Sequence, residues 1–287
     1  MQIDDLAMGR LVDAPMSSGA ANDTAGVLVD IPHPGTLRIT LNRPHRMNAL
    51  DDAAIDAVHE ALDLAARDPN CGVVLLTSST KAFCTGFDMT GYDGDPASRG
   101  GAAAVAEQMD RLGDIPVRMR RARQVVIAVV RGPAIGGGFA LALGADIILA
   151  GESASFALPQ TQLGVLAAEM GLSYLLPRIV GLNRAADLML RGRRWNAADA
   201  ELAGLVSEVR PDDQVDEAGL VLANDLSRRS INALSGTKRM LLAGLESAHL
   251  EATMQAETQS QVLSNYWPEL RESIARFNAR RQPHPEE

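Results

Sequence analysis

The stretch VVIAVVRGPAIGGGF, residues 125–139, joins a run of apolar residues to three consecutive glycines. Six apolar residues in a row over Val125–Val130 are typical of a parallel strand that is buried on both faces. Glycine is used where a chain must turn sharply or approach a ligand closely, and we expect a helix to begin at the glycines and run to Leu143. The first N–H groups of that helix would lack intrahelical partners and lie at the positive end of its dipole. The stretch therefore predicts a strand, a turn and a helix with free amides at its start.

A second junction of the same kind lies earlier in the chain. The segment AFCTGFDM, residues 82–89, closely follows the continuous apolar run Val73–Leu76, which also indicates a buried strand. Gly86 stands where this second chain segment is expected to turn. Amides from two separate loops can converge on one oxygen, which is how an oxyanion hole places donors where negative charge develops. The alternative interpretation is that both segments are ordinary tight turns of an α/β sheet.

The surrounding segments alternate between strand and helix patterns. The apolar runs Val27–Ile31 and Leu37–Leu41 predict a strand pair, and Ile147–Ala150 predicts a further buried strand. Asp51 or Asp52 is expected to cap the helix that follows the strand pair. This β-β-α repetition indicates the α/β class. The predicted organisation is a disordered tail over 1–26, an α/β core over 27–210 and a helical subdomain over 211–287.

Composition excludes several classes of function. The chain has 287 residues, a formal net charge of −9 and an aromatic content of 3%. A nucleic-acid-binding protein is disfavoured, because basic patches and stacking aromatics are expected there. No run of about 18 uncharged apolar residues is present, so no membrane span or membrane partner is expected. The N-terminal region lacks the apolar run of a signal peptide, which predicts a cytoplasmic protein, with Met16 as a second candidate start.

Other known site motifs fit the sequence badly. Cys71 and Cys84 match neither a disulfide framework nor a zinc-binding spacing, and no metal site is expected. The glycines over 132–138 do not form G-x-G-x-x-G, and no Lys-Ser/Thr pair follows them as a P-loop requires. There is no G-x-S-x-G around a serine and no H-E-x-x-H.

Five segments in chain order resemble motifs of the crotonase superfamily, also called the enoyl-CoA hydratase/isomerase family. They are LNRPHRMNAL at 41–50, FCTGFDM at 83–89, the glycine triplet at 136–138, YLLPRIVG at 174–181 and FNARRQP at 277–283. The resemblance implies a crotonase-like spiral of β-β-α units with a C-terminal helical subdomain, assembled as a homotrimer or as a hexamer of two trimers. It also implies an acyl-CoA thioester as the substrate, with coenzyme A as part of that substrate and no separate cofactor.

The same resemblance assigns candidate site residues. The backbone N–H groups of Phe87 and Gly137 are the expected catalytic donors to the thioester oxygen. The implied substrate-binding positions are Arg46, Asp88, Met89, Gly136, Ala140, Gln160, Phe277 and Arg280. Arginine suits the phosphates of coenzyme A because its donors form a planar fork, although Arg280 could equally be a solvent-exposed charge. The arginines at 118, 120, 121 and 123 are interpreted first as cations at a helix C-terminus and second as a phosphate site.

The acid and base residues depart from the family pattern. Hydratases of the family use two glutamates, and this chain has Ala140 and Gln160 at those positions. Glu169 remains nearby among small and apolar residues, which raise the pKa of a carboxyl group, and isomerase-like members carry an acid in this turn. One carboxylate is enough to move a double bond, so we expect isomerisation of an enoyl-CoA. The alternatives are a hydratase with non-standard residues, a non-catalytic CoA-binding protein, a structural role for Glu169, or Glu152 as the acid.

Overall fold

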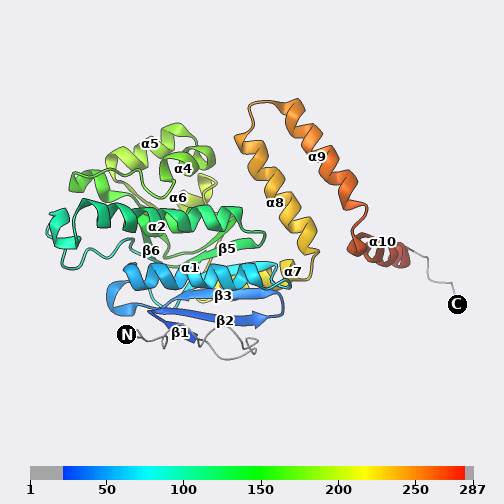
Figure 1. Ribbon diagram of the computed structural model, residues 1–287, viewed down its shortest axis with the longest axis horizontal. Coiled ribbons are helices and arrows are strands. Elements are labelled where there is room, and N and C mark those ends of the chain that lie inside the picture. Colours follow the sequence, from blue (N-terminus) through cyan, green and yellow to red (C-terminus); the bar gives the residue numbers. More distant parts are fainter. Residues whose placement is uncertain (1–21, 282–287) are drawn as a thin grey trace, which may run out of the picture.

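Two β-sheets form the centre of the computed structural model, which describes residues 22–281 (Figure 1). Within these residues the larger sheet has seven strands, in the spatial order β1 (Asn22–Thr24), β2 (Val27–His33), β3 (Thr36–Leu41), β4 (Val73–Ser78), β5 (Val125–Val130), β7 (Ile147–Gly151) and β10 (Glu208–Arg210). The smaller sheet has three, in the order β6 (Pro133–Ile135), β8 (Ser155–Ala157) and β9 (Arg194–Asn196). The strands from β3 to β10 in the larger sheet run parallel.

Helices connect the strands and form the C-terminal part of the described chain. The α-helices are α1 (Asp52–Arg67), α2 (Ala102–Arg121), α3 (Gly137–Leu143), α4 (Leu172–Val180), α5 (Leu182–Arg191), α6 (Ala197–Leu202), α7 (Val215–Ser227), α8 (Ile231–Glu246), α9 (Leu250–Ser264) and α10 (Pro268–Arg281). Short 3-10 helices are η1 (Pro44–Arg46), η2 (Pro96–Arg99) and η3 (Pro159–Leu163). None of these helices is long and apolar enough to cross a membrane.

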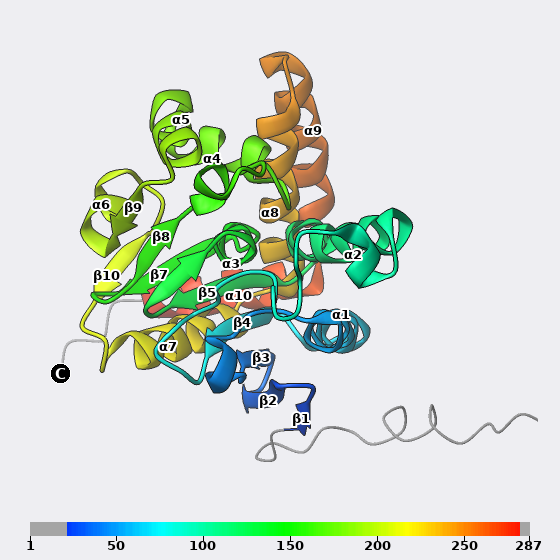
Figure 2. The ribbon, with the colours of Figure 1, turned by 90° about the vertical axis from the view of Figure 1, so that its left-hand side faces the viewer.

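The continuous apolar runs of β4 and β5 are explained by burial on both faces of the sheet. Alternate residues such as Val74 and Val126 pack into the main core with α1, α2 and α3. Their neighbours Val73 and Val125 face the other way and pack against α7. Figure 2 shows α7 on the opposite side of the larger sheet from α3. A strand covered on both faces has no polar side, because successive side chains point in opposite directions.

From β5 onward the chain passes between the two sheets, whereas β1 to β4 belong to the larger sheet alone. From β5 the chain enters β6 of the smaller sheet, then α3, and returns to the larger sheet as β7. From β7 it again enters the smaller sheet as β8 before the helices α4 and α5. This arrangement confirms the predicted α/β fold of repeated β-β-α units with C-terminal helices. It also places the start of α3 directly after β6 of the smaller sheet.

The local predictions around the first strands hold with one correction. β2 and β3 pair antiparallel as predicted, and Asp51 caps α1 by accepting a hydrogen bond from the N–H of Ala54 at 2.9 Å. The predicted tail is wrong over 22–26, because Asn22–Thr24 forms β1 and pairs with β2. The sequence pattern gave no sign of the backbone hydrogen bonds that join β1 to β2. The rest of the predicted tail, residues 1–21, lies outside the described residues.

A buried ion pair joins α8 to the α/β core. The Lys238 ammonium donates to Asp146 Oδ2 at 2.7 Å and to the backbone oxygens of Met119 and Gln124, both at 2.8 Å. Asp146 also accepts a hydrogen bond from the N–H of Val126. Burial lowers the pKa of Lys238 and raises that of Asp146, and their mutual attraction opposes both shifts. These four contacts fix the position of α8 against the end of α2 and the start of β5.

The last helices carry many exposed apolar side chains. Helices α8, α9 and α10 stand to one side of the sheets in Figure 1. Exposed apolar residues on and between these helices are Leu241, Leu245, Leu250, Met254, Val262, Leu263, Tyr266, Ile274 and Phe277. Where exposed apolar side chains join into one large patch, they mark an interaction site, so these helices are candidates for one.

Candidate active site

The two glycine-containing loops predicted from the sequence lie directly against each other. Cys84 and Ala134 form a parallel bridge in which the N–H of Cys84 donates to Pro133 O at 3.1 Å and the N–H of Ile135 donates to Cys84 O at 3.0 Å. Gly138 then passes so close that a Cβ at this position would lie 2.1 Å from Cys84 O. The absence of a side chain at Gly138 therefore allows the start of α3 to dock on the first loop.

This docking brings the two predicted amides to one place. A Cβ built on Gly86 would lie 3.0 Å from the nitrogen of Gly137, and one built on Gly137 would lie 3.8 Å from the nitrogen of Phe87. In the part of the chain that the structure describes, neither the Phe87 nor the Gly137 N–H donates a hydrogen bond. Gly86 has φ +90°, which an L side chain rarely adopts, so glycine permits this approach. The pair of unused donors has the form of an oxyanion hole.

The segment 41–50 holds the first loop in this position. Leu50 donates its N–H to Gly86 O at 2.7 Å and accepts one from Asp88 at 2.9 Å, so the peptide groups on both sides of Phe87 are fixed. The buried Asn48 side chain donates to Ala82 O at 2.9 Å and to Phe83 O at 3.1 Å. These bonds give the asparagine and leucine of this motif a physical role in shaping the loop.

Glu169 is the carboxylate that the structure places beside the second loop. A Cβ on Gly136 would lie 3.4 Å from Glu169 Oε1 and 3.0 Å from Gln160 Nε2, so both side chains border Gly136. Gln160 Nε2 donates to Glu169 Oε1 at 2.7 Å, and Gln160 Oε1 is buried without a partner. Burial raises the pKa of Glu169, and the hydrogen bond from Gln160 offsets part of that rise. A carboxylate with a raised pKa is suited to taking up and returning a proton.

The other positions considered for acid–base chemistry are less suitable. Ala140 is fully buried within α3, so its methyl group packs in the core and presents no surface to a substrate in this structure. Glu152 is exposed in the turn between β7 and β8. In the described ranges no cluster of three His, Cys, Asp or Glu side chains could hold a metal ion.

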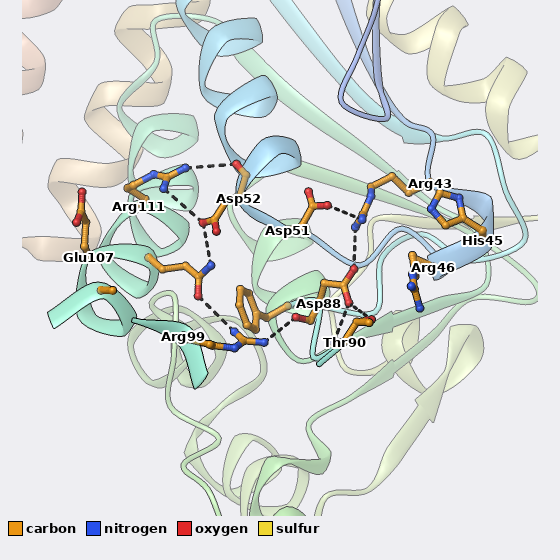
Figure 3. A pocket seen from close by; sticks show the side chains of 13 residues that line it. Arg43, His45, Arg46, Asp51, Asp52, Asp88, Thr90, Arg99, Glu107 and Arg111 are labelled. Carbon is orange, nitrogen blue, oxygen red and sulfur yellow. Dashed lines mark hydrogen bonds and ion pairs between the residues drawn. The ribbon is translucent and has the colours of Figure 1, made fainter. Parts of the chain in front are cut away.

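A cavity of about 660 Å³ adjoins the first loop (Figure 3). Its wall includes the predicted residues Arg46 and Asp88, and also Arg43, which the sequence interpretation did not single out. Arg43 donates to Asp51 at 2.5 Å and to Asp88 at 3.2 Å, and thereby ties the loop to the start of α1. Hydrogen bonds from Thr90 and the nearby Arg43 lower the pKa of Asp88. Asp88 is therefore engaged within the protein, whereas Arg46 is exposed on the cavity wall.

Met89 and the two predicted C-terminal residues lie in different surroundings. Met89 is 56% exposed directly after the first loop. Phe277 is exposed on α10, which lies at the other end of the molecule from the segment that leads into α2 (Figure 1). Arg280 also belongs to α10, and its side chain lies outside the described residues. Within one chain, α10 therefore lies away from the Phe87 and Gly137 amides.

Arg99 is a site residue that the sequence interpretation missed. Its guanidinium lies over the rings of Phe87 and Tyr92, 4.2 and 4.5 Å from their centres, and donates to Asp88 O at 2.9 Å. Most residues around Arg99 in the segment 91–101 are exposed, whereas Arg99 is half-buried. Arg99 also donates to Gln108 Oε1 of α2 at 3.3 Å. The available signal was a basic residue in a loop rich in glycine, which is too common a pattern to indicate this contact.

Replacing Arg99 by methionine is expected to lower kcat for an acyl-CoA substrate by about tenfold or more, because small displacements of reacting groups are costly. Methionine keeps the length of the side chain but removes the charge that attracts the Phe87 ring and the donor to Asp88 O. The measurement is kcat and KM separately, with Arg99→Lys as the variant that keeps a cation and part of the activity. A rise in KM alone would instead assign Arg99 to contact with the coenzyme A phosphates.

Comparison with known proteins agrees with this geometry. The sequence profile described as "Enoyl-CoA hydratase/isomerase" matches residues 33–287. The chain is 40% identical over 251 residues to a Mycobacterium bovis protein named "Probable enoyl-CoA hydratase echA12", covering 87% of this chain and 88% of that protein.

Solved structures give the same assignment. An enoyl-CoA hydratase from Bacillus anthracis superposes with a TM-score of 0.82 at 28% identity, covering 90% of this chain and 98% of that one. A monofunctional enoyl-CoA isomerase from Mycobacterium smegmatis superposes with a TM-score of 0.68 at 38% identity, covering 80% of this chain and 98% of that one. The similar proteins therefore include both a hydratase and an isomerase. With its fold, its paired loop amides and these matches, the chain belongs to the enoyl-CoA hydratase/isomerase (crotonase) family of enzymes, which act on acyl-CoA thioesters.

Proposed function

We propose that this enzyme moves a carbon–carbon double bond in an enoyl-CoA, with the Phe87 and Gly137 amides as oxyanion donors and Glu169 as the proton carrier. The thioester oxygen accepts hydrogen bonds from the two amides that lack partners within the described chain. Negative charge builds on that oxygen when a proton leaves the neighbouring carbon, and donors already in place stabilise it. Removing one such donor from a comparable hydrolytic enzyme raises the barrier by about 3–4 kcal/mol.

The proposed reaction uses one carboxylate in two steps. Glu169, ionised, takes a proton from carbon 2 of a 3-enoyl thioester, and the electron pair of that C–H bond enters a dienolate held by the two amides. Protonated Glu169 then returns the proton to carbon 4, and the dienolate collapses to the 2-enoyl thioester. No atom is gained or lost, and Glu169 ends in its starting state. Burial raises the pKa of Glu169, which favours the protonated form that returns the proton.

The observation that carries this proposal is the position of Glu169 beside Gly136, together with a buried alanine at 140 and a glutamine at 160. The proposal predicts that the purified enzyme converts 3-hexenoyl-CoA into 2-hexenoyl-CoA. Chromatography of the two thioesters measures this conversion. If the enzyme instead mainly converts 2-hexenoyl-CoA into 3-hydroxyhexanoyl-CoA, its reaction is hydration and not isomerisation. The absence of any turnover of either thioester would favour a non-catalytic CoA-binding protein.

Hydration remains the second candidate because of one unused acceptor. Gln160 Oε1 is buried and has no hydrogen-bond partner, while the same side chain contacts Glu169 through Nε2. A carbonyl oxygen at this point could hold one water molecule next to the carboxylate. Glu169 would then have to activate that water and also supply a proton, a double task that two glutamates share in the standard hydratases.

The proposed enzyme is a homotrimer or a hexamer of two trimers. Support comes from the exposed apolar residues on α8, α9 and α10, which a partner subunit would cover. In such an assembly Phe277 and Arg280 would approach the coenzyme A of a neighbouring subunit, with Arg46 and Met89 contributed by the subunit that holds the thioester. The family resemblance supplies this arrangement, and the position of α10 away from the amides of its own chain is compatible with it.

A further inference from the structure

A second cavity, of about 330 Å³, lies between the end of α2, the start of α4 and the end of α8. Its body is apolar, and it is lined by side chains that include Val117, Leu175, Ile179, Leu242 and Leu245. This volume is at the lower end of the range found for small-molecule sites, which combine an apolar lining with a few polar groups that fix orientation. The cavity is separate from the larger one next to Phe87, because the two share no lining residue.

Met170 links this cavity to the proposed reaction centre. The cavity wall includes Met170 and Gly171, which directly follow Glu169. The Met170 sulfur lies 3.1 Å from the position of a Cβ on Gly137, so the same side chain borders the oxyanion amide. Met170 also has φ +47°, a left-handed conformation that a non-glycine residue keeps only when its surroundings impose it. An acyl chain whose thioester is held by Gly137 would pass this side chain to reach the cavity.

The charged groups on the cavity wall are mostly cationic. Arg120, Arg121 and Arg178 line it, and one acid, Glu246, lies with them. Arg178 is already occupied, since its guanidinium stacks on the Tyr174 ring at 3.6 Å and donates to Tyr174 O. Arg121, by contrast, is solvent-exposed, and its guanidinium makes no hydrogen bond or ion pair with any residue that the structure describes. An apolar cavity with an exposed, unpaired guanidinium at its rim is complementary to an alkyl chain that ends in an anion.

We propose that this cavity receives the far end of the acyl chain and that Arg121 binds a terminal carboxylate there, so that the preferred substrates are ω-carboxyacyl-CoA thioesters. The inference rests on the proposed function, because the thioester must first be held at Phe87 and Gly137. Guanidinium and carboxylate form charge-assisted, often bidentate hydrogen bonds. A neutral alkyl end of the same length would leave Arg121 without a partner. Arg120 adds to the positive charge of the same wall.

The test compares matched thioesters by calorimetry, without any turnover. Adipoyl-, suberoyl- and sebacoyl-CoA are compared with hexanoyl-, octanoyl- and decanoyl-CoA, each pair differing only in the terminal carboxylate. At the chain length that reaches Arg121, the dicarboxylic member is expected to bind about tenfold more tightly or better, as for a hydrogen bond between charged groups. Arg121→Gln is expected to remove this ratio. Arg118→Gln, which removes the same charge from the same helix but faces Asp63, is expected to keep it.

Equal dissociation constants within every pair, or a ratio that survives in Arg121→Gln, would overturn the inference. Turnover of 3-hexenoyl-CoA by the same preparations tests the proposed function separately. Isomerisation without any carboxylate preference would refute the substrate class and leave the reaction standing. A carboxylate preference that depends on Arg121, without isomerisation, would support the binding site and refute the reaction.

Discussion

Glu169→Gln is expected to lower kcat for double-bond isomerisation by about a hundredfold or more, the usual contribution of a positioned acid or base. Glutamine has nearly the same shape as glutamate, so its oxygen can still accept the hydrogen bond that Gln160 Nε2 donates at 2.7 Å. It cannot take up the proton from carbon 2. The measurement is kcat on 3-hexenoyl-CoA, together with the affinity for hexanoyl-CoA, which is expected to change little.

Glu152→Gln is the matched control, because it removes a carboxylate that is exposed in a turn away from Gly136. It is expected to have wild-type turnover. Undiminished turnover in Glu169→Gln, or a comparable loss in Glu152→Gln, would remove Glu169 from the mechanism.

The raised pKa of Glu169 also gives this prediction a pH dependence. The wild-type rate should increase as pH rises through that pKa, because only the ionised form removes a proton from substrate. For stability the sign is opposite: the folded protein binds this proton more tightly than the unfolded chain does. The free energy of unfolding therefore decreases as pH rises from the unfolded pKa through the folded one. Glu169→Gln should remove this contribution and leave the protein at least as stable as the wild type at neutral pH.

Gly138→Ala is expected to destabilise the fold by several kcal/mol and to abolish activity. The new Cβ would lie 2.1 Å from the oxygen and 2.6 Å from the carbonyl carbon of Cys84, both of which are backbone atoms that cannot rotate away. Relieving the clash requires moving α3 away from the first loop. Because overpacking in a core costs about 1–3 kcal/mol and occasionally more, and here two backbones collide, the upper end applies. The separation of the Phe87 and Gly137 amides would increase at the same time.

The matched control is Gly113→Ala, a glycine in α2 whose Cβ would meet no atom within 4 Å. Alanine is favoured over glycine in a helix by about 1 kcal/mol, so this variant should unfold at a higher temperature than the wild type. Thermal unfolding and turnover of the two variants check the prediction. A Gly138→Ala protein with wild-type Tm and kcat would show that the two loops do not pack as described.

The sequence was informative where burial and glycine geometry determine local structure. The apolar run Val125–Val130 and the following glycines predicted β5 and an α3 that ends at Leu143, as the structure has them. These predictions succeed because a strand buried on both faces and a helix that starts at glycine both leave strong local patterns. The bonds of β1 with β2 were not predicted, because a three-residue edge strand depends on a partner strand and has almost no pattern of its own.

The residues of the candidate site likewise divide into those that the sequence predicted and those that it did not. Phe87, Gly137 and Glu169 could be proposed from motif positions, and the structure brings Glu169 and both amides around the same glycine-containing turn. Arg99 could not be proposed, since its contact with Phe87 is made across a loop whose path the sequence does not determine. Arg121 was interpreted as a helix-terminal cation, and its position on the second cavity depends on how α8 packs beside α2.

The ion pair between Lys238 and Asp146 affects which parts of the surface can change in sequence without disturbing the core. Hydrogen bonds to an ammonium are directional, so they hold the middle of α8 at one angle, whereas a purely apolar contact would let the helix slide. In the proposed oligomer, substitutions on the surface of α9 and α10 would therefore change subunit contacts with little strain transmitted back to the loops proposed to bind the thioester. Altering the Lys238 contact itself would shift the helix that forms one wall of the second cavity, and so would change both the proposed assembly and the proposed acyl selectivity.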